Sequence, residues 1–226
     1  MKCAIIHNPN DDLSVRLMND SIASCNQFNI SPEPFPGTFK DSIDGKIEQY
    51  KLVPSIYKLE PKNGESGCFV SHYELWLRCI NENQSYMILE HDAIMKRSLP
   101  ENILNQFDGI LNLDPCGAYQ KDLEKYIKCS TNKSLNRVDK LPKPIGSLTW
   151  NTAKQYHVPG AYAYIIKPAA AEQLVKNAQS FGYLPVDVHI NSYYVSISTV
   201  TPSVFKICDF MLDRKNRVKY SSTKRG

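Results

Sequence analysis

The chain has 226 residues, of which 42% are hydrophobic and 22% are charged, and its formal net charge at pH 7 is +4. These values are ordinary for a globular protein with a sizeable core, and no apolar run approaches the roughly 20 residues that cross a bilayer. The opening MKCAIIHNPNDD is no secretory signal, because its short apolar run soon meets polar residues. We therefore expect no transmembrane segment and a cytoplasmic location.

The positive charge is concentrated at the C-terminus. Residues 213–226 contain six Lys/Arg and one Asp, so the preceding residues are close to neutral. We expect one domain over residues 1–212 and a basic tail over residues 213–226. Two interpretations of the tail stay open, a weak contact with an anionic surface and a solvated chain end.

The seven cysteines are dispersed along the chain and include no CxxC pair. This distribution argues against a secreted disulfide framework and against a structural zinc site. We expect reduced thiols that mostly act as small buried hydrophobic side chains.

The first ninety residues alternate between strand and helix patterns. Residues 3–8 are an apolar run that predicts a buried strand, and apolar residues at helical spacing follow from Leu13. The segment NISPEPFPGTF has three prolines and a glycine, which predicts an irregular loop. Ser71 followed by Glu74 predicts a capping box at the start of a helix, and the apolar SYMILE predicts the next buried strand.

The second half continues the same alternation. We expect a brief helix opened by Pro100, a strand at residues 110–113, and long loops over the polar residues 115–158. A strand at residues 161–166, a helix that begins at Pro168 and a last strand near residues 204–210 follow. This succession predicts a single domain of the α/β class.

Two carboxylates follow the apolar strand in MILEHDAI, residues 87–94. On a strand, Glu90 and Asp92 would face the same way and His91 the other way. Two carboxylates this close repel unless a cation lies between them, and hard divalent ions bind carboxylates together with substrate phosphates. Two interpretations stay open: a Mg²⁺ or Mn²⁺ diphosphate site at the end of an α/β strand, and acidic residues that only cap the next turn.

The segment GESGCFVSHYELWLRCINENQSYMILEHDAIM resembles the core signature of glycosyltransferase family 25, which includes bacterial lipooligosaccharide and collagen galactosyltransferases. The family pattern is Gly-x-x-Gly-Cys, then Ser-His, a helix with Trp, and a strand that ends in Glu-Asp-Asp. The matching residues are Gly64, Gly67, Cys68, Ser71, His72 and Trp76. Residues 159–175 resemble the family's Gly-x-x-Ala-Tyr-x-Ile strand and its helix, and residues 185–190 resemble a segment with another Asp.

This resemblance, over roughly residues 1–110 and 155–195, implies a fold and an activity. The fold is a single GT-A type nucleotide-diphospho-sugar transferase domain, with a mixed central sheet flanked by helices. The activity is an inverting sugar transfer that uses a divalent metal ion, Mn²⁺ or Mg²⁺. The donor is a UDP-sugar, most often UDP-galactose, and the acceptor is a glycan or glycoconjugate, as in lipopolysaccharide biosynthesis.

The resemblance also implies roles for individual residues. Glu90 and Asp92 would hold the metal ion against the diphosphate, with His189 as a further ligand. Asp187 would be the base that takes the proton of the acceptor hydroxyl. The residues expected to contact the donor are Asn8, Arg16, His72 and His91. For His72, Asp187 and His189, a structural role in the core or at a cap is the open alternative.

His91 stands where the family has the middle Asp of Glu-Asp-Asp. The change removes one negative charge, which should weaken the affinity for the metal ion or change its preference. It supports an alternative, a catalytically degenerate GT-A domain that binds a glycan or a partner. A third hypothesis, a nucleic-acid-directed protein that uses the basic tail, lacks an aromatic-rich basic stripe to support it.

Overall fold

The protein was examined as a computed structural model. The structure describes residues 1–55, 63–114, 137–141, 158, 161–213 and 215–216. Most of the expected long loops and most of the basic tail lie outside these residues.

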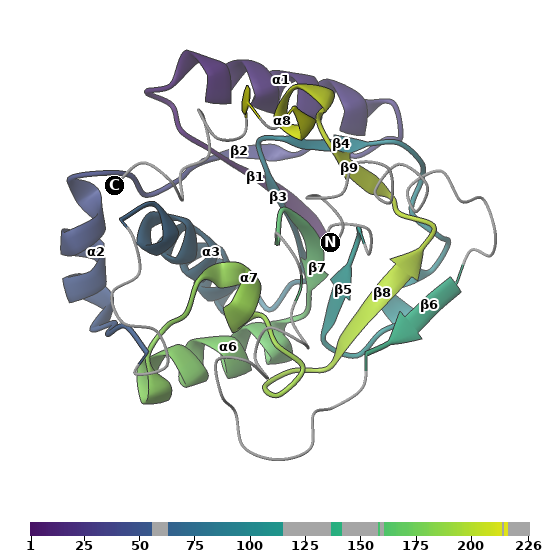
Figure 1. Ribbon diagram of the computed structural model, residues 1–226. Helices are drawn as coiled ribbons and strands as arrows, with labels where there is room; N and C mark the ends of the chain where they lie inside the picture. Colours follow the sequence, from purple (N-terminus) through teal and green to yellow (C-terminus); the bar gives the residue numbers. More distant parts are fainter. Residues whose placement is uncertain (56–62, 115–136, 142–157, 159–160, 214, 217–226) are drawn as a thin grey trace.

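A mixed seven-stranded sheet forms the centre of the molecule, in the order β2-β1-β3-β7-β5-β8-β6 (Figure 1). Neighbouring strands pair in parallel except at β7 and β6, which run antiparallel to the strands beside them. A separate two-stranded sheet joins β4 and β9. The strands are β1 (Lys2–His7), β2 (Glu33–Pro36), β3 (Tyr86–Glu90), β4 (Ala93–Met95), β5 (Ile110–Asn112), β6 (Arg137–Lys140), β7 (Ala163–Ile166), β8 (Ile197–Thr201) and β9 (Phe205–Ile207).

Helices cover both faces of the sheet (Figure 1). One face carries α2 (Ser42–Tyr50), α3 (Asn63–Asn81), α6 (Pro168–Phe181) and α7 (Val186–His189), and the other carries α1 (Asp12–Asn26), α8 (Asp209–Leu212) and the β4–β9 pair. A 3-10 turn, η1 (Ile103–Asn105), stands near the helix expected at Pro100. Within the described residues, no helix combines the length and the apolar character that a membrane span needs.

Alternate strand residues fill two separate cores. On β3, Ile88 packs with α3 and α6, whereas Met87 and Leu89 pack on the side of α1. All three side chains are fully buried, as expected for a central strand covered on both faces. The predicted α/β class, with a mixed central sheet flanked by helices, is confirmed.

The proline-rich segment forms a strand, so the predicted irregular loop is wrong there. Strand β2 includes Pro34 and Pro36, and β1 is its one partner among the described strands. An edge strand has one side without ladder bonds, and a proline tolerates that position because it has no N–H to donate.

The predicted capping box at Ser71 is also wrong, because α3 begins eight residues earlier, at Asn63. Ser71 lies inside the helix, where its hydroxyl donates to the carbonyl of Gly67 (2.7 Å) and accepts from the backbone N–H of Thr38 (2.8 Å). Ser71 therefore connects α3 to the loop before α2, and a local pattern cannot distinguish this contact from a cap.

Gly67 occupies a position on α3 where a side chain would collide with that loop. A Cβ at Gly67 would lie 2.5 Å from the carbonyl oxygen of Thr38, whereas a Cβ at Gly45 in α2 would meet nothing within 4 Å. We expect Gly67→Ala to lower the free energy of unfolding by about 1–3 kcal/mol, although alanine favours helix. Gly45→Ala is the matched control and should raise it by about 1 kcal/mol. Denaturant unfolding measures both, and a stabilised Gly67→Ala protein would contradict the contact.

Candidate active site

Asn8, Glu90, His91 and Asp92 lie where β1 and β3 end, at what we call the carboxyl edge of the sheet. The two strands are parallel, with Ile6 opposite Glu90, so Asn8 and the turn His91–Asp92 leave the sheet at the same edge. Strand β3 ends at Glu90. The predicted alternation of Glu90, His91 and Asp92 along a strand is therefore wrong, because the last two residues lie in a turn.

Glu90 is held by two side chains of α3. Its Oε1 accepts a hydrogen bond from the Cys68 thiol (3.3 Å) and lies 3.3 Å from Nε2 of His72. Burial raises the pKa of Glu90, but the hydrogen bond from His72, the charge of His91 and the hydrogen bond from Cys68 together hold it below its ordinary value. Glu90 is therefore an anion at neutral pH, with its side chain 25% exposed.

Asp92 has a buried carboxylate oxygen, Oδ1, that has no hydrogen-bond partner in the part of the chain that the structure describes. Burial raises the pKa of Asp92, the charge of His91 lowers it and the charge of Glu90 raises it, with a net pKa of about 6. A buried anionic oxygen beside a second carboxylate is costly in the protein alone. A divalent cation would satisfy it, so these residues fit a hard metal ion bound by oxygen.

Asp187, at the start of α7, belongs to the same group of charges. Burial is the largest cause of the raised pKa of the Cys68 thiol, and the charges of Glu90, Asp187 and Asp92 each raise it further. Asp187 therefore lies within electrostatic reach of the Cys68 thiol, which donates to Glu90. Among the described residues, Cys68, His72 and Glu90 also form a group whose ligand atoms lie within 4.8 Å of one another.

His189 lies in the core between α3 and α6, away from the group of carboxylates. It is 1% exposed, its ring stacks on Trp76 at 5.9 Å, and its Nε2 lies 3.2 Å from the carbonyl of Leu174. Residues 186–189 form a helix, on which positions two apart point in different directions, so Asp187 and His189 do not share one face. The role of His189 as a metal ligand stays a prediction, and its position does not support it.

His189→Leu is expected to leave metal and nucleotide binding unchanged and to make the protein less sensitive to acid. Burial lowers the pKa of His189 to about 4, so the folded state excludes a proton that the unfolded chain takes up near pH 6.5. Wild type should therefore lose about 2 kcal/mol more than the variant between pH 7.5 and pH 5. Denaturant unfolding at both pH values measures this difference. A variant that loses Mn²⁺-dependent nucleotide binding would instead support a ligand role.

The four residues expected at the donor differ in their placement. The backbone N–H of Asn8 donates to the Ser14 hydroxyl (2.8 Å), and the guanidinium of Arg16 lies 5.6 Å from the centre of the Phe210 ring. His91 is partly exposed at the carboxyl edge. His72 is fully buried, and its two ring nitrogens form hydrogen bonds with Tyr164 and Glu90. Neither ring nitrogen is therefore left to contact the nucleotide sugar.

Sequence reasoning missed a second buried carboxylate at this edge. Asp114 follows β5 and is 1% exposed, and it accepts hydrogen bonds from the hydroxyls of Tyr162 and Ser203 (2.6 Å from Ser203). The sequence pattern that could have found Asp114 is ILNLD, residues 110–114, an apolar strand followed by an acidic residue, as in MILE, residues 87–90. His7 was also missed: it ends β1 with a buried Nδ1 that has no partner among the described residues.

The fold and this edge together define a class, an α/β protein whose acidic side chains converge where parallel strands end. The family model of Glycosyltransferase family 25 (LPS biosynthesis protein) matches residues 26–190, well over half of the chain. The chain therefore belongs to glycosyltransferase family 25, which confirms the resemblance found in the sequence.

Two curated relatives from Haemophilus influenzae are similar to the chain. Lipooligosaccharide biosynthesis protein lex-1 is 30% identical over 161 residues, 70% of this chain and 49% of that protein. Lipooligosaccharide biosynthesis protein lic2B is 33% identical over 73 residues, 30% of this chain and 27% of that protein. The chain thus spans about half the length of the first relative and about a quarter of the second.

One solved structure, the galactosyltransferase LgtC in complex with donor and acceptor sugar analogs, has a TM-score of 0.41 and 9% identity. The match covers 100% of this chain and 84% of that one. A likeness of this size carries no conclusion about the site.

Proposed function

We propose that the protein is a metal-dependent glycosyltransferase that transfers a sugar from a UDP-sugar to a hydroxyl of a glycan or glycoconjugate. Galactose is the first candidate sugar, and lipooligosaccharide is the first candidate acceptor. Membership of family 25 and the names of the two relatives support the proposal. The observation that carries it is the buried Oδ1 of Asp92, which has no hydrogen-bond partner among the described residues and feels the charge of Glu90 at the carboxyl edge.

The residues of the edge would divide the work between them. Glu90 and Asp92 would hold Mn²⁺ or Mg²⁺, which when bound neutralises the charge that develops on the leaving diphosphate. Asp187 would accept the proton of the acceptor hydroxyl as its oxygen attacks the sugar, which gives an inverted product in a single displacement. Asn8 and Arg16 would contact the donor.

His91 changes the electrostatics of the edge relative to the family pattern. Its charge lowers the pKa of both Glu90 and Asp92, where an aspartate would repel them. The substitution would therefore keep both carboxylates ionised while it removes one candidate oxygen ligand. We propose a single catalytic domain over residues 1–212, with the basic tail as a possible weak contact to an anionic surface.

The proposal is tested by release of UDP from separate UDP-sugars, with lipooligosaccharide as acceptor and Mn²⁺ present. The expected result is release with one donor, UDP-galactose first, that needs both the acceptor and the metal ion. Nucleotide binding without turnover for any donor would favour the second candidate, a degenerate binding module, which His91 supports. If the wild type is such a degenerate module, His91→Asp should create turnover. If the wild type is active, the same substitution should lower its turnover.

A further inference from the structure

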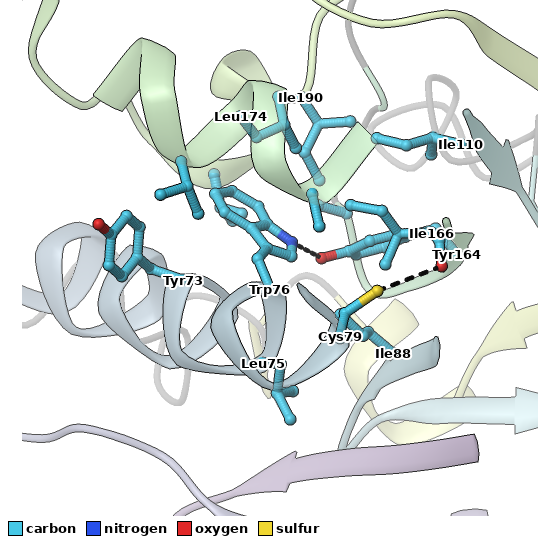
Figure 2. Close-up of a cluster of buried hydrophobic side chains, with 14 of the residues drawn as sticks. Tyr73, Leu75, Trp76, Cys79, Ile88, Ile110, Tyr164, Ile166, Leu174 and Ile190 are labelled. Atoms are coloured by element: carbon cyan, nitrogen blue, oxygen red, sulfur yellow. Dashed lines mark hydrogen bonds between the residues drawn. The ribbon is translucent and has the colours of Figure 1, made fainter. Parts of the chain in front are cut away.

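A chain of buried hydrogen bonds leads from the core to Glu90. The indole Nε1 of Trp76 donates to the hydroxyl oxygen of Tyr164 at 2.9 Å, a contact drawn in Figure 2. The same hydroxyl lies 2.8 Å from Nδ1 of His72, and Nε2 of His72 lies 3.3 Å from Oε1 of Glu90. Trp76, Tyr164 and His72 are all 0% exposed. We call these three residues the relay.

The direction of the bonds follows from the two ends of the relay. The ionised Glu90 carboxylate can only accept, so Nε2 of a neutral His72 carries the imidazole proton and donates it to Glu90, and Nδ1 is the acceptor. The indole N–H of Trp76 can only donate, so the Tyr164 oxygen accepts it and donates its own proton to Nδ1 of His72. Oε1 of Glu90 thus receives two donors, His72 and the Cys68 thiol.

The relay leaves the other oxygen of Glu90 for a different partner. Within the described residues, every bond to the Glu90 side chain ends on Oε1, and Oε2 receives none. A glutamate with three rotatable side-chain bonds loses rotamer freedom when it is held in one conformation. The two donors from α3 fix the Glu90 side chain before any ion binds, because α3 and β7 hold the relay in place.

We propose that Tyr164 and His72 are positioning residues, which hold Glu90 by Oε1 so that Oε2 faces the divalent cation. This inference rests on the proposed function, and it gives His72 a different role from the donor contact expected from the sequence. It also connects residues from three separate segments, β7, α3 and the end of β3. Partners behind a metal-binding side chain typically change metal affinity by about 10–100-fold when they are removed.

Tyr164→Phe tests the inference, because it removes one hydroxyl and keeps the ring. Affinity for Mn²⁺ in the presence of saturating UDP is measured from the signal of free Mn²⁺ by electron paramagnetic resonance. We expect Tyr164→Phe to weaken it about 10–100-fold. Trp76→Phe, which removes the first donor of the relay, should change it in the same direction by a smaller factor and serves if Tyr164→Phe fails to fold.

Tyr183→Phe is the matched control for a purely structural effect. Tyr183 is also buried (2% exposed), and its hydroxyl lies 2.9 Å from that of Ser66, outside the relay. Tyr183→Phe should leave the Mn²⁺ affinity within about twofold of wild type, whatever its effect on stability. Equal Mn²⁺ affinity in Tyr164→Phe and Tyr183→Phe would overturn the positioning role alone. A wild-type protein that binds no Mn²⁺ with UDP would overturn the proposed function as well.

Discussion

Asp92→Asn is expected to abolish metal-dependent nucleotide binding and, at the same time, to stabilise the metal-free protein. Loss of an anionic ligand should weaken Mn²⁺-dependent UDP affinity by more than about a hundredfold, since even indirect partners of a metal change affinity by up to that factor. The stabilisation has a separate cause, the buried and unpartnered Oδ1 of Asp92. A residue that lowers the free energy of unfolding of the metal-free protein but is needed for metal-dependent binding is what an ion site predicts.

The stabilisation should depend on pH in a defined direction. Burial raises the pKa of Asp92 from 3.8 to about 6, so the folded state binds a proton more tightly than the unfolded chain. Wild type therefore loses stability as pH rises from about 4 through 6, by about 2–3 kcal/mol in all. Asp92→Asn lacks this loss, so its gain should be present at pH 8 and absent near pH 4.

Denaturant unfolding of the metal-free protein at pH 8 and pH 4, together with UDP titration at pH 8, measures both effects of Asp92→Asn. Asp209→Asn is the control, because that carboxylate is 82% exposed and pairs with Lys206 at 2.7 Å; its effect on stability should stay below about 1 kcal/mol. Retained UDP binding in Asp92→Asn would remove Asp92 from the ion site.

Asp187→Asn is expected to remove turnover and to leave donor binding intact. Asparagine has nearly the same shape but cannot take the proton of the acceptor hydroxyl, so transfer should fall by about 10²–10⁴-fold. UDP affinity in Mn²⁺ should stay within about threefold of wild type. UDP release with acceptor and calorimetric titration of UDP measure the two quantities.

Two outcomes of the Asp187→Asn experiment would contradict a base at this position. Lost UDP binding would make Asp187 a ligand of the ion, which fits its electrostatic effect on the nearby Cys68 thiol. Unchanged turnover would remove it from the chemistry. Glu172→Gln, on the exposed side of α6, is the control and should change neither quantity.

Periodic patterns predicted most of the fold, and contacts between distant segments account for what they missed. Apolar runs and helical spacing identified β1, β3, β7, α1 and α6, because each of these elements buries a face of its own sequence. Strand β2 was missed because a strand tolerates prolines mainly at the edge of a sheet. Its edge position depends on its pairing with β1, which a local pattern does not show. The early start of α3 was missed because Ser71 bonds to Thr38, 33 residues away.

The same division applies to the site. Glu90 and Asp92 could be proposed from the sequence because their spacing and the family signature are both local. The relay could not be proposed in this way, since Trp76 and His72 meet Tyr164 across 88 and 92 residues of sequence. For His189, a short motif suggested a ligand, which stays a prediction, whereas the packing of α7 places its ring among Phe69, Trp76 and Tyr194.

The central claim, that the carboxylates at the carboxyl edge bind a nucleoside diphosphate through a divalent cation, has one direct test. UDP is titrated calorimetrically into the full chain, first with Mn²⁺ and then with a chelator. The expected result is binding at one site per chain that needs Mn²⁺ and disappears with the chelator. Equal binding with the chelator, or no binding of UDP with any divalent ion, would contradict the claim.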